Sequence, residues 1–192
     1  MQLTLVGSYP SPFVRRIRLA LEKTPFEFRA INIYEEPGRS ELLRLSPINQ
    51  IPVLLVNGEP LWDSRIQLQF LGKKLGWPEL SIAQENVLTV TERMMDAGVA
   101  LFLLRKSSLR EDAMYPQRLN QRIETVMEWL SPWMTSPEAR EWNLMTMTLV
   151  SALEWMQFRE IHPIATGESA AAFLALHAQR PIVQQTHPSK GA

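Results

Sequence analysis

A serine directly ahead of a predicted helix is the main candidate for a catalytic side chain in this sequence. In the stretch GSYPSPFVRRIRLAL, Ser11 stands directly before Pro12 and an apolar repeat. Serine at the N-cap with proline at the next position is a common helix start. Ser11 is therefore either a helix cap or the hydroxyl of an active site, and its position alone does not separate the two roles.

Sites that use a cysteine, a metal ion or another catalytic serine are not indicated by the sequence. The chain has no cysteine, so any thiol chemistry must use a thiol that a ligand brings. Its 3 histidines are too scattered to form a metal pair on a helix, and we expect no metal. The segment GESAA approximates a turn that carries a catalytic serine, but it ends in alanine and follows a predicted helix, so we interpret it as a helix-capping segment.

The elements that must position Ser11 are predicted to form an α/β unit over residues 1–76. Apolar runs predict strands, and a period of three to four residues predicts helices. The predicted order is a strand LTLV ending at Gly7, a helix from Pro12, a strand in PFEFRAINIY, a short helix from Ser40 to Leu45, a strand VLLV, a tight turn at Asn57-Gly58, a short edge strand with Pro60, and a helix from Asp63-Ser64 to near Gly76.

Apolar stripes predict which faces of the two longer helices are buried. In the helix from Pro12, the stripe comprises Phe13, Ile17, Ala20 and Leu21, and the polar positions include Arg15, Arg16 and Arg18. In the helix from Asp63-Ser64, we expect Ile66, Phe70 and Leu71 to face the sheet.

Strand patterns end after the first 76 residues, and the rest of the chain is predicted to be helical. Periodic segments indicate helices over residues 82–105, 116–130 and 143–158, and the last is apolar nearly all round, which is typical of a helix inside a bundle. We expect the final QQTHPSKGA to be a frayed end. The predicted organisation is an α/β domain over residues 1–76 and an all-helical domain over residues 82–185.

Charge and hydropathy argue against nucleic acid and membranes as partners of this chain. The 20 Lys and Arg residues balance 20 Asp and Glu residues, so net charge provides no attraction to nucleic acid or to an anionic membrane. No apolar run approaches the ~18–20 residues of a membrane span, and the first residues lack a secretory-signal pattern. We expect a cytoplasmic protein without nucleic-acid or membrane partners.

The order of elements, together with three motifs, resembles the cytosolic glutathione S-transferase superfamily. The motifs are SPFVRR, SPINQIPVLLV and DSRIQLQFL. The resemblance covers the whole chain and implies a thioredoxin-like N-terminal domain followed by an all-helical C-terminal domain. Further stretches look most like bacterial homologues of unknown substrate: VGSYPSPFVRR, RMMDAGV and FREIHP. One departure is Thr146, which stands after the expected cap Asn143 where most of the family has aspartate.

This resemblance implies a glutathione site in the first domain. Ile51-Pro52 matches a cis-proline peptide whose backbone pairs with the cysteinyl part of glutathione. Asp63-Ser64 matches an acid-serine pair that holds the γ-glutamyl end, although Asp63 also fits a plain N-cap. Gln50 stands where many relatives place a polar side chain on the ligand.

The resemblance also implies how glutathione is activated. Ser11 matches a serine that several classes of the family use, with Ser8 and Tyr9 as neighbouring candidates. A hydroxyl donor and a helix N-terminus stabilise a thiolate, lowering the pKa of a thiol from its ordinary value of about 8.5. The thiolate then attacks an electrophile.

The function implied is a glutathione transferase that is a homodimer, with glutathione as co-substrate and a small apolar electrophile as second substrate. The electrophile is expected against a helix of the second domain that carries Met94, Met95, Asp96 and Arg105. Two alternatives stay open: a glutathione-dependent peroxidase or disulfide reductase, and a non-catalytic interaction module such as the family's starvation-response regulators of RNA polymerase. Ile51-Pro52 and Asp63-Ser64 favour ligand binding over the second alternative.

Overall fold

A four-stranded mixed sheet forms the centre of the N-terminal part of the chain. The computed structural model describes residues 1–191. The strands β1 (Leu3–Gly7), β2 (Glu27–Ala30), β3 (Val53–Val56) and β4 (Glu59–Leu61) lie in the order β2-β1-β3-β4. β1 is parallel to β2, and β3 is antiparallel to both β1 and β4. Asn57 and Gly58 both have positive φ in the β3–β4 turn, which confirms the predicted hairpin.

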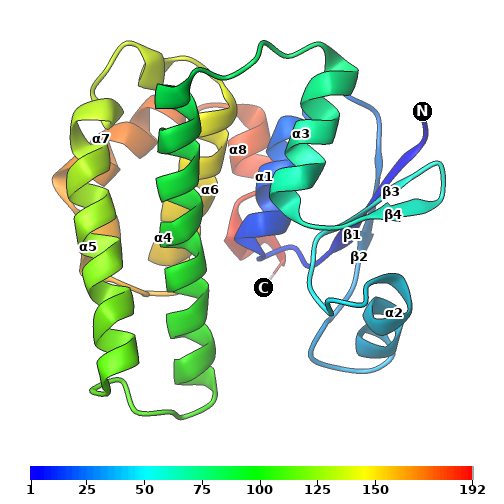
Figure 1. Ribbon diagram of the computed structural model, residues 1–192, viewed down its shortest axis with the longest axis horizontal. Coiled ribbons are helices and arrows are strands. Elements are labelled where there is room, and N and C mark those ends of the chain that lie inside the picture. The colour runs from blue at the N-terminus through cyan, green and yellow to red at the C-terminus, as the bar shows by residue number, and fades with distance from the viewer. Residues whose placement is uncertain (192) are drawn as a thin grey trace. The chain divides into compact units, whose positions relative to one another are not determined.

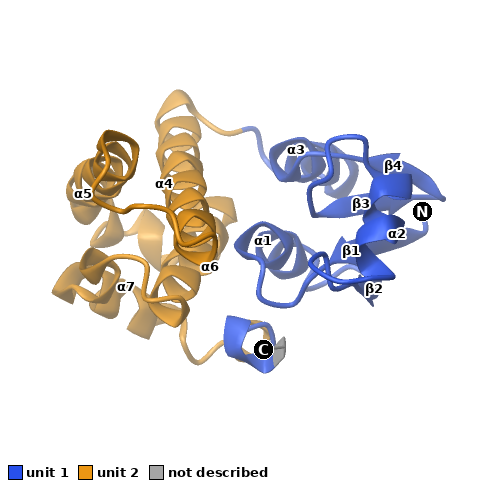
Figure 2. Cartoon of the chain, turned by 90° about the horizontal axis from the view of Figure 1, so that it is seen from below, with its two compact units in different colours: residues 1–79, 185–192 blue, residues 80–184 orange. Residues whose placement is uncertain are grey.

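Helices lie along both faces of this sheet. α1 (Pro12–Ala20) packs against α3 (Ser64–Leu75), and α2 (Gly38–Leu45) lies away from that pair, across the sheet (Figure 2). Leu42 of α2 joins Val6 of β1 and Val53 of β3 in a buried cluster. Because strand side chains alternate, Leu5 and Leu54 point to the opposite face, and both are fully buried.

The buried stripes of α1 and α3 differ from the predicted ones. Arg15 and Arg16 are 1% and 2% exposed, so they lie inside and not on a polar face. In α3 the prediction for Ile66 is wrong, because this side chain is 46% exposed. The buried positions of α3 are Ser64, Gln67, Leu68 and Leu71. Polar side chains therefore occupy buried helix positions that we expected to be apolar or exposed.

The end of the chain is ordered, so the expectation of a frayed tail is wrong. α8 (Pro181–Gln185) and a short 3-10 segment (Pro188–Gly191) flank Thr186, which is 2% exposed. The Arg15 Nε donates a hydrogen bond to Thr186 Oγ1 at 3.2 Å. A buried guanidinium needs such partners, and one of them comes from this segment. Ala192, the last residue of the expected tail, lies outside the described residues.

The middle of the chain is helical (Figure 1). Its helices are α4 (Ile82–Lys106), α5 (Met114–Met134), α6 (Leu144–Phe158) and α7 (Glu168–His177), with 3-10 turns at Glu138–Arg140 and Pro163–Thr166. α4 packs against both α5 and α6. Nearly every residue of α6 from Met145 to Met156 is buried, which confirms the prediction of a helix inside a bundle.

Asn143 caps α6 as predicted, and Thr146 completes the cap. The Thr146 amide donates to Asn143 Oδ1, and the Asn143 amide donates to Thr146 Oγ1, both at 2.9 Å. The Thr146 hydroxyl thus accepts from the backbone amide of the cap residue, as the carboxylate does in other capping boxes.

The chain divides into two compact units (Figure 2). The first comprises Met1–Glu79 and the segment from Gln185 onward, and the second comprises Leu80–Gln184. A mixed sheet with flanking helices and a separate helical unit confirm the predicted fold class, a thioredoxin-like domain followed by an all-helical one. Among residues 1–191, no helix has the length and hydropathy that a membrane span requires.

Candidate functional site

Ser11 is the N-cap of α1. Its Oγ accepts a hydrogen bond from the Val14 amide at 3.3 Å, and Pro12 occupies the first helical position. β1 ends just before, at Gly7, where an added Cβ would lie 2.4 Å from Val14 Cγ2. This close approach of strand and helix leaves a short loop, which carries Ser8 and Tyr9 to the helix start. The Ser11 hydroxyl keeps its proton for a second partner, because the cap uses the oxygen only as an acceptor.

The two neighbouring candidates are placed differently. The Ser8 carbonyl accepts a hydrogen bond from the Ser11 amide at 3.3 Å, which closes a turn ahead of α1. The Tyr9 ring packs edge-on against Phe28 of β2, with 4.9 Å between ring centroids. The Arg18 guanidinium lies over both rings, 5.3 Å from the Tyr9 centroid and 4.8 Å from the Phe28 centroid. Tyr9 therefore belongs to a cation–π cluster on β2 and α1.

Asp63 is the N-cap of α3. Its Oδ1 accepts hydrogen bonds from the amides of Arg65 and Ile66 at 2.9 and 3.2 Å. The backbone of Asp63 has φ 64° and ψ 120°, a conformation that few residues other than glycine adopt. The carboxylate is exposed at the helix end, so its second oxygen can meet a cation from solvent.

Ser64, the first residue of α3, is bonded to a buried arginine. Arg16 of α1 donates through Nη2 to the Ser64 Oγ. Ser64 is 5% exposed and Arg16 is 2% exposed. The Asp63 carboxylate caps the two amides that follow Ser64, so neither capping bond engages the amide of Ser64 itself. A helix N-terminus backed by a guanidinium is an electropositive position that suits an anion.

The peptide Ile51–Pro52 is cis, as the resemblance implied. It precedes β3, with Pro52 buried, Ile51 half-buried and Gln50 exposed. Gln67 of α3 donates through Nε2 to the Pro52 carbonyl at 2.9 Å and to the Leu61 carbonyl at 2.8 Å. The cis-proline turn and the start of α3 are thus joined inside one unit of the fold.

Sequence reasoning did not single out Arg16 and Gln67, nor a second cis peptide at Glu36–Pro37. A pattern in the sequence could have indicated the first two. Position 16 falls on the helical stripe of Phe13, Ile17 and Ala20, and position 67 stands three residues after Ser64. A polar residue on a buried stripe indicates a specific hydrogen-bond partner.

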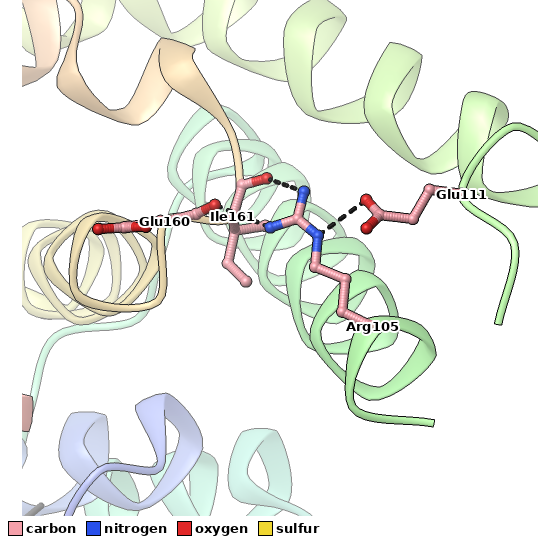
Figure 3. A network of polar contacts seen from close by, with 4 residues as sticks. All are labelled: Arg105, Glu111, Glu160 and Ile161. Carbon is pink, nitrogen blue, oxygen red and sulfur yellow. Dashed lines mark hydrogen bonds and ion pairs between the residues drawn. The ribbon is translucent and has the colours of Figure 1, made fainter. Parts of the chain in front are cut away.

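The residues assigned to a second-substrate pocket lie on α4. Met94 and Met95 are both fully buried. The Arg105 Nε donates to Glu111 Oε2 at 2.8 Å, and its two terminal nitrogens donate to the carbonyls of Glu160 at 2.8 Å and Ile161 at 3.1 Å (Figure 3). The Arg105 guanidinium therefore holds the turn that follows α6. A role for these three side chains in substrate binding stays a prediction.

No group of three or more His, Cys, Asp or Glu side chains capable of holding a metal ion is found in the described part of the chain. The candidate site is therefore built from a serine at one helix start, an acid-serine pair at another, and the cis-proline turn.

Comparisons with known proteins relate the N-terminal part of this chain to a protein family. Residues 1–73 match the glutathione S-transferase N-terminal domain. The uncharacterized GST-like protein YibF of Escherichia coli (strain K12) is 25% identical over 176 residues, which cover 84% of this chain and 85% of YibF.

Solved structures share the whole fold. A glutathione S-transferase from Methylobacterium radiotolerans in complex with glutathione sulfonate has a TM-score of 0.82 at 20% identity, covering 98% of this chain and 95% of that one. One from Methylobacillus flagellatus with glutathione bound has a TM-score of 0.82 at 15% identity, covering 97% of this chain and 100% of that one. Residues 1–73 therefore match the glutathione S-transferase N-terminal domain family, and the chain as a whole has the fold of solved glutathione S-transferases.

Proposed function

We propose that this chain binds glutathione and acts as a glutathione transferase. The observation that carries the proposal is the start of α3, where the exposed Asp63 carboxylate adjoins Ser64 and the buried Arg16 guanidinium. A γ-glutamyl group presents a carboxylate and an ammonium group on one carbon. The carboxylate suits the helix N-terminus near Arg16, and the ammonium group suits Asp63. Similar transferases hold glutathione sulfonate and glutathione, which supports glutathione as the ligand.

The cysteinyl part of glutathione would pair with the backbone at the cis turn. Ile51 is half-buried there, and Gln50 is exposed beside it. A peptide segment that adds to backbone in this way gains main-chain hydrogen bonds that do not depend on the side chain. Gln50 then offers a side-chain contact to the same ligand.

We assign to Ser11 the hydrogen bond that stabilises the thiolate of glutathione. Its hydroxyl proton is free to donate while its oxygen accepts from Val14, and the amide dipoles of α1 point toward the same place. After the thiol loses its proton to solvent, the thiolate forms a C–S bond to an electrophilic carbon. The leaving group departs with the electron pair of the broken bond. Ser8 and Tyr9 are the alternatives for this contact.

Titration calorimetry with glutathione, followed by a conjugation assay, tests the proposal. We expect binding in the wild-type chain and loss of turnover in Ser11→Ala, because alanine has no hydroxyl. Ser11→Thr is the matched control, since threonine keeps the hydroxyl and still caps a helix. Unchanged turnover in Ser11→Ala would reduce Ser11 to a cap and direct attention to Ser8 or Tyr9.

Absence of binding at millimolar glutathione would reject the transferase and would favour a non-catalytic interaction module. The alternative activity is that of a glutathione-dependent peroxidase or disulfide reductase, in which glutathione would supply every thiol because the chain has no cysteine. Replacing the electrophile by a peroxide in the same assay distinguishes this reaction from conjugation.

We further propose that the protein is a homodimer of the cytoplasm, which sedimentation equilibrium and cell fractionation would test.

A further inference from the structure

One fully buried amide side chain joins two segments of the candidate site. Gln67, on α3, is 0% exposed. Its Nε2 donates to the carbonyl of Pro52, in the cis-proline turn, and to the carbonyl of Leu61, at the end of β4. Asp63, the cap of α3, follows two residues after Leu61. Both N–H groups of a single amide thus hold the turn and the approach to α3 at a fixed separation.

The acceptor end of the same amide is not used. Within residues 1–191, the buried Oε1 of Gln67 accepts no hydrogen bond. A buried polar atom without a partner is unfavourable, and an apolar side chain of similar length would avoid that cost. Packing alone therefore does not account for an amide at position 67. The two donated bonds do, because they fix backbone that an apolar side chain would leave unattached.

We propose that Gln67 is a positioning residue for glutathione binding. It contacts the carbonyls of Pro52 and Leu61, and through them it sets the distance between the backbone that receives the cysteinyl part and the helix start that receives the γ-glutamyl end. A ligand that spans two segments gains most when both are already in place, because it then spends little binding energy on ordering them. This inference rests on the proposed function.

The substitution Gln67→Met tests it. Methionine is similar in length, fills a buried gap and has no N–H donor. We expect the affinity for glutathione to fall about tenfold, or about 1.4 kcal/mol, because the ligand would then have to order the two segments itself. The matched control is Gln69→Met, because Gln69 is exposed on the same helix, and it should bind as the wild type does. Calorimetric affinity of Gln67→Met within twofold of the wild type would overturn the proposal.

A double-mutant cycle separates positioning from a general loss of stability. If Gln67 acts by holding the start of α3, then Ser64→Ala should cost less affinity in Gln67→Met than in the wild type. Additive effects would contradict the proposal. A wild-type chain that does not bind glutathione would reject the proposed function, and with it this inference, whereas binding that Gln67→Met leaves intact rejects the inference alone.

A measurement on the wild-type protein covers the case in which Gln67→Met fails to fold. The side-chain amide protons of Gln67, observed by ¹⁵N NMR, should be protected from solvent exchange and should shift when glutathione saturates the site. Rapid exchange, or signals that stay unchanged at saturation, would overturn the proposal.

Discussion

Asp63 caps α3 and is proposed to bind the ligand, and substitutions by alanine and by asparagine separate these two roles. Its Oδ1 accepts from two amides at 2.9 and 3.2 Å, and its φ is 64°. Asparagine caps helices as well as aspartate does and tolerates positive φ. Alanine lacks the capping oxygen and is strained at this φ.

The stability of the two variants follows from these contacts. Loss of an N-cap side chain costs about 1 kcal/mol, and alanine in a left-handed conformation adds about 1 kcal/mol. Asp63→Ala should therefore lower the free energy of unfolding by about 2 kcal/mol, which for a chain of 192 residues lowers Tm by roughly 4–8 °C. Asp63→Asn should remain within about 0.5 kcal/mol of the wild type, because the cap is kept.

The affinity for glutathione should fall in Asp63→Asn, although the stability of that variant should not. Asp63→Asn removes the charge proposed to pair with the γ-glutamyl ammonium group, and a charge-assisted hydrogen bond contributes about 1.5 kcal/mol at its lower end, or roughly tenfold in Kd. Thermal unfolding and calorimetry with glutathione measure both quantities on the same samples. Tight binding by Asp63→Asn would refute the ammonium contact, and a wild-type Tm in Asp63→Ala would refute the cap.

Three further predictions concern the helical unit. Burial lowers the pKa of His177 below its ordinary value of 6.5, so the stability it contributes is complete above pH 6.5 and is lost as the pH falls through the folded-state pKa. Urea unfolding at pH 7.5 and 5.5 should show this loss, and His177→Gln should reduce the difference; an unchanged difference would contradict it. Arg105→Met should lower the free energy of unfolding by about 1.5 kcal/mol because two backbone carbonyls, one exposed and one partly buried, lose a charged donor, and an effect no larger than that of Glu111→Gln would argue against this reason. Thr146→Ala should cost about 1 kcal/mol in urea unfolding, and less when Asn143 is already alanine; additive costs would exclude a shared cap.

Local features of the fold could be predicted because they depend on neighbours in the sequence. The Asn57-Gly58 hairpin and the Asn143 cap each need only a few adjacent residues, and both are confirmed. The cis peptide at Ile51–Pro52 came from the resemblance to a family, since few X-Pro bonds are cis.

The partners of buried polar side chains could not be predicted in the same way, because those partners lie far along the chain. Arg15 bonds with Thr186, which is 171 positions away, and Arg16 bonds with Ser64, which is 48 positions away. A helical period assigns arginine to solvent unless such a partner is known. For the same reason the tail was expected to fray, although it supplies Thr186 to α1.

A polar side chain on a buried stripe needs a reason, and its partners distinguish a structural reason from a functional one. Thr146 bonds with Asn143 in the cap of its own helix and with the Glu141 carbonyl just before that cap, so its effect should end with the stability of α6. Gln67 bonds instead to the carbonyls of Pro52 in the cis-proline turn and Leu61 at the end of β4, and its own oxygen accepts no hydrogen bond. A side chain kept only for stability would not retain an unsatisfied oxygen at such a place, since a methionine could fill the same space. The benefit of an amide at position 67 therefore lies in the backbone geometry that it holds. For this reason we expect Gln67→Met to weaken glutathione binding about tenfold while the Tm changes little.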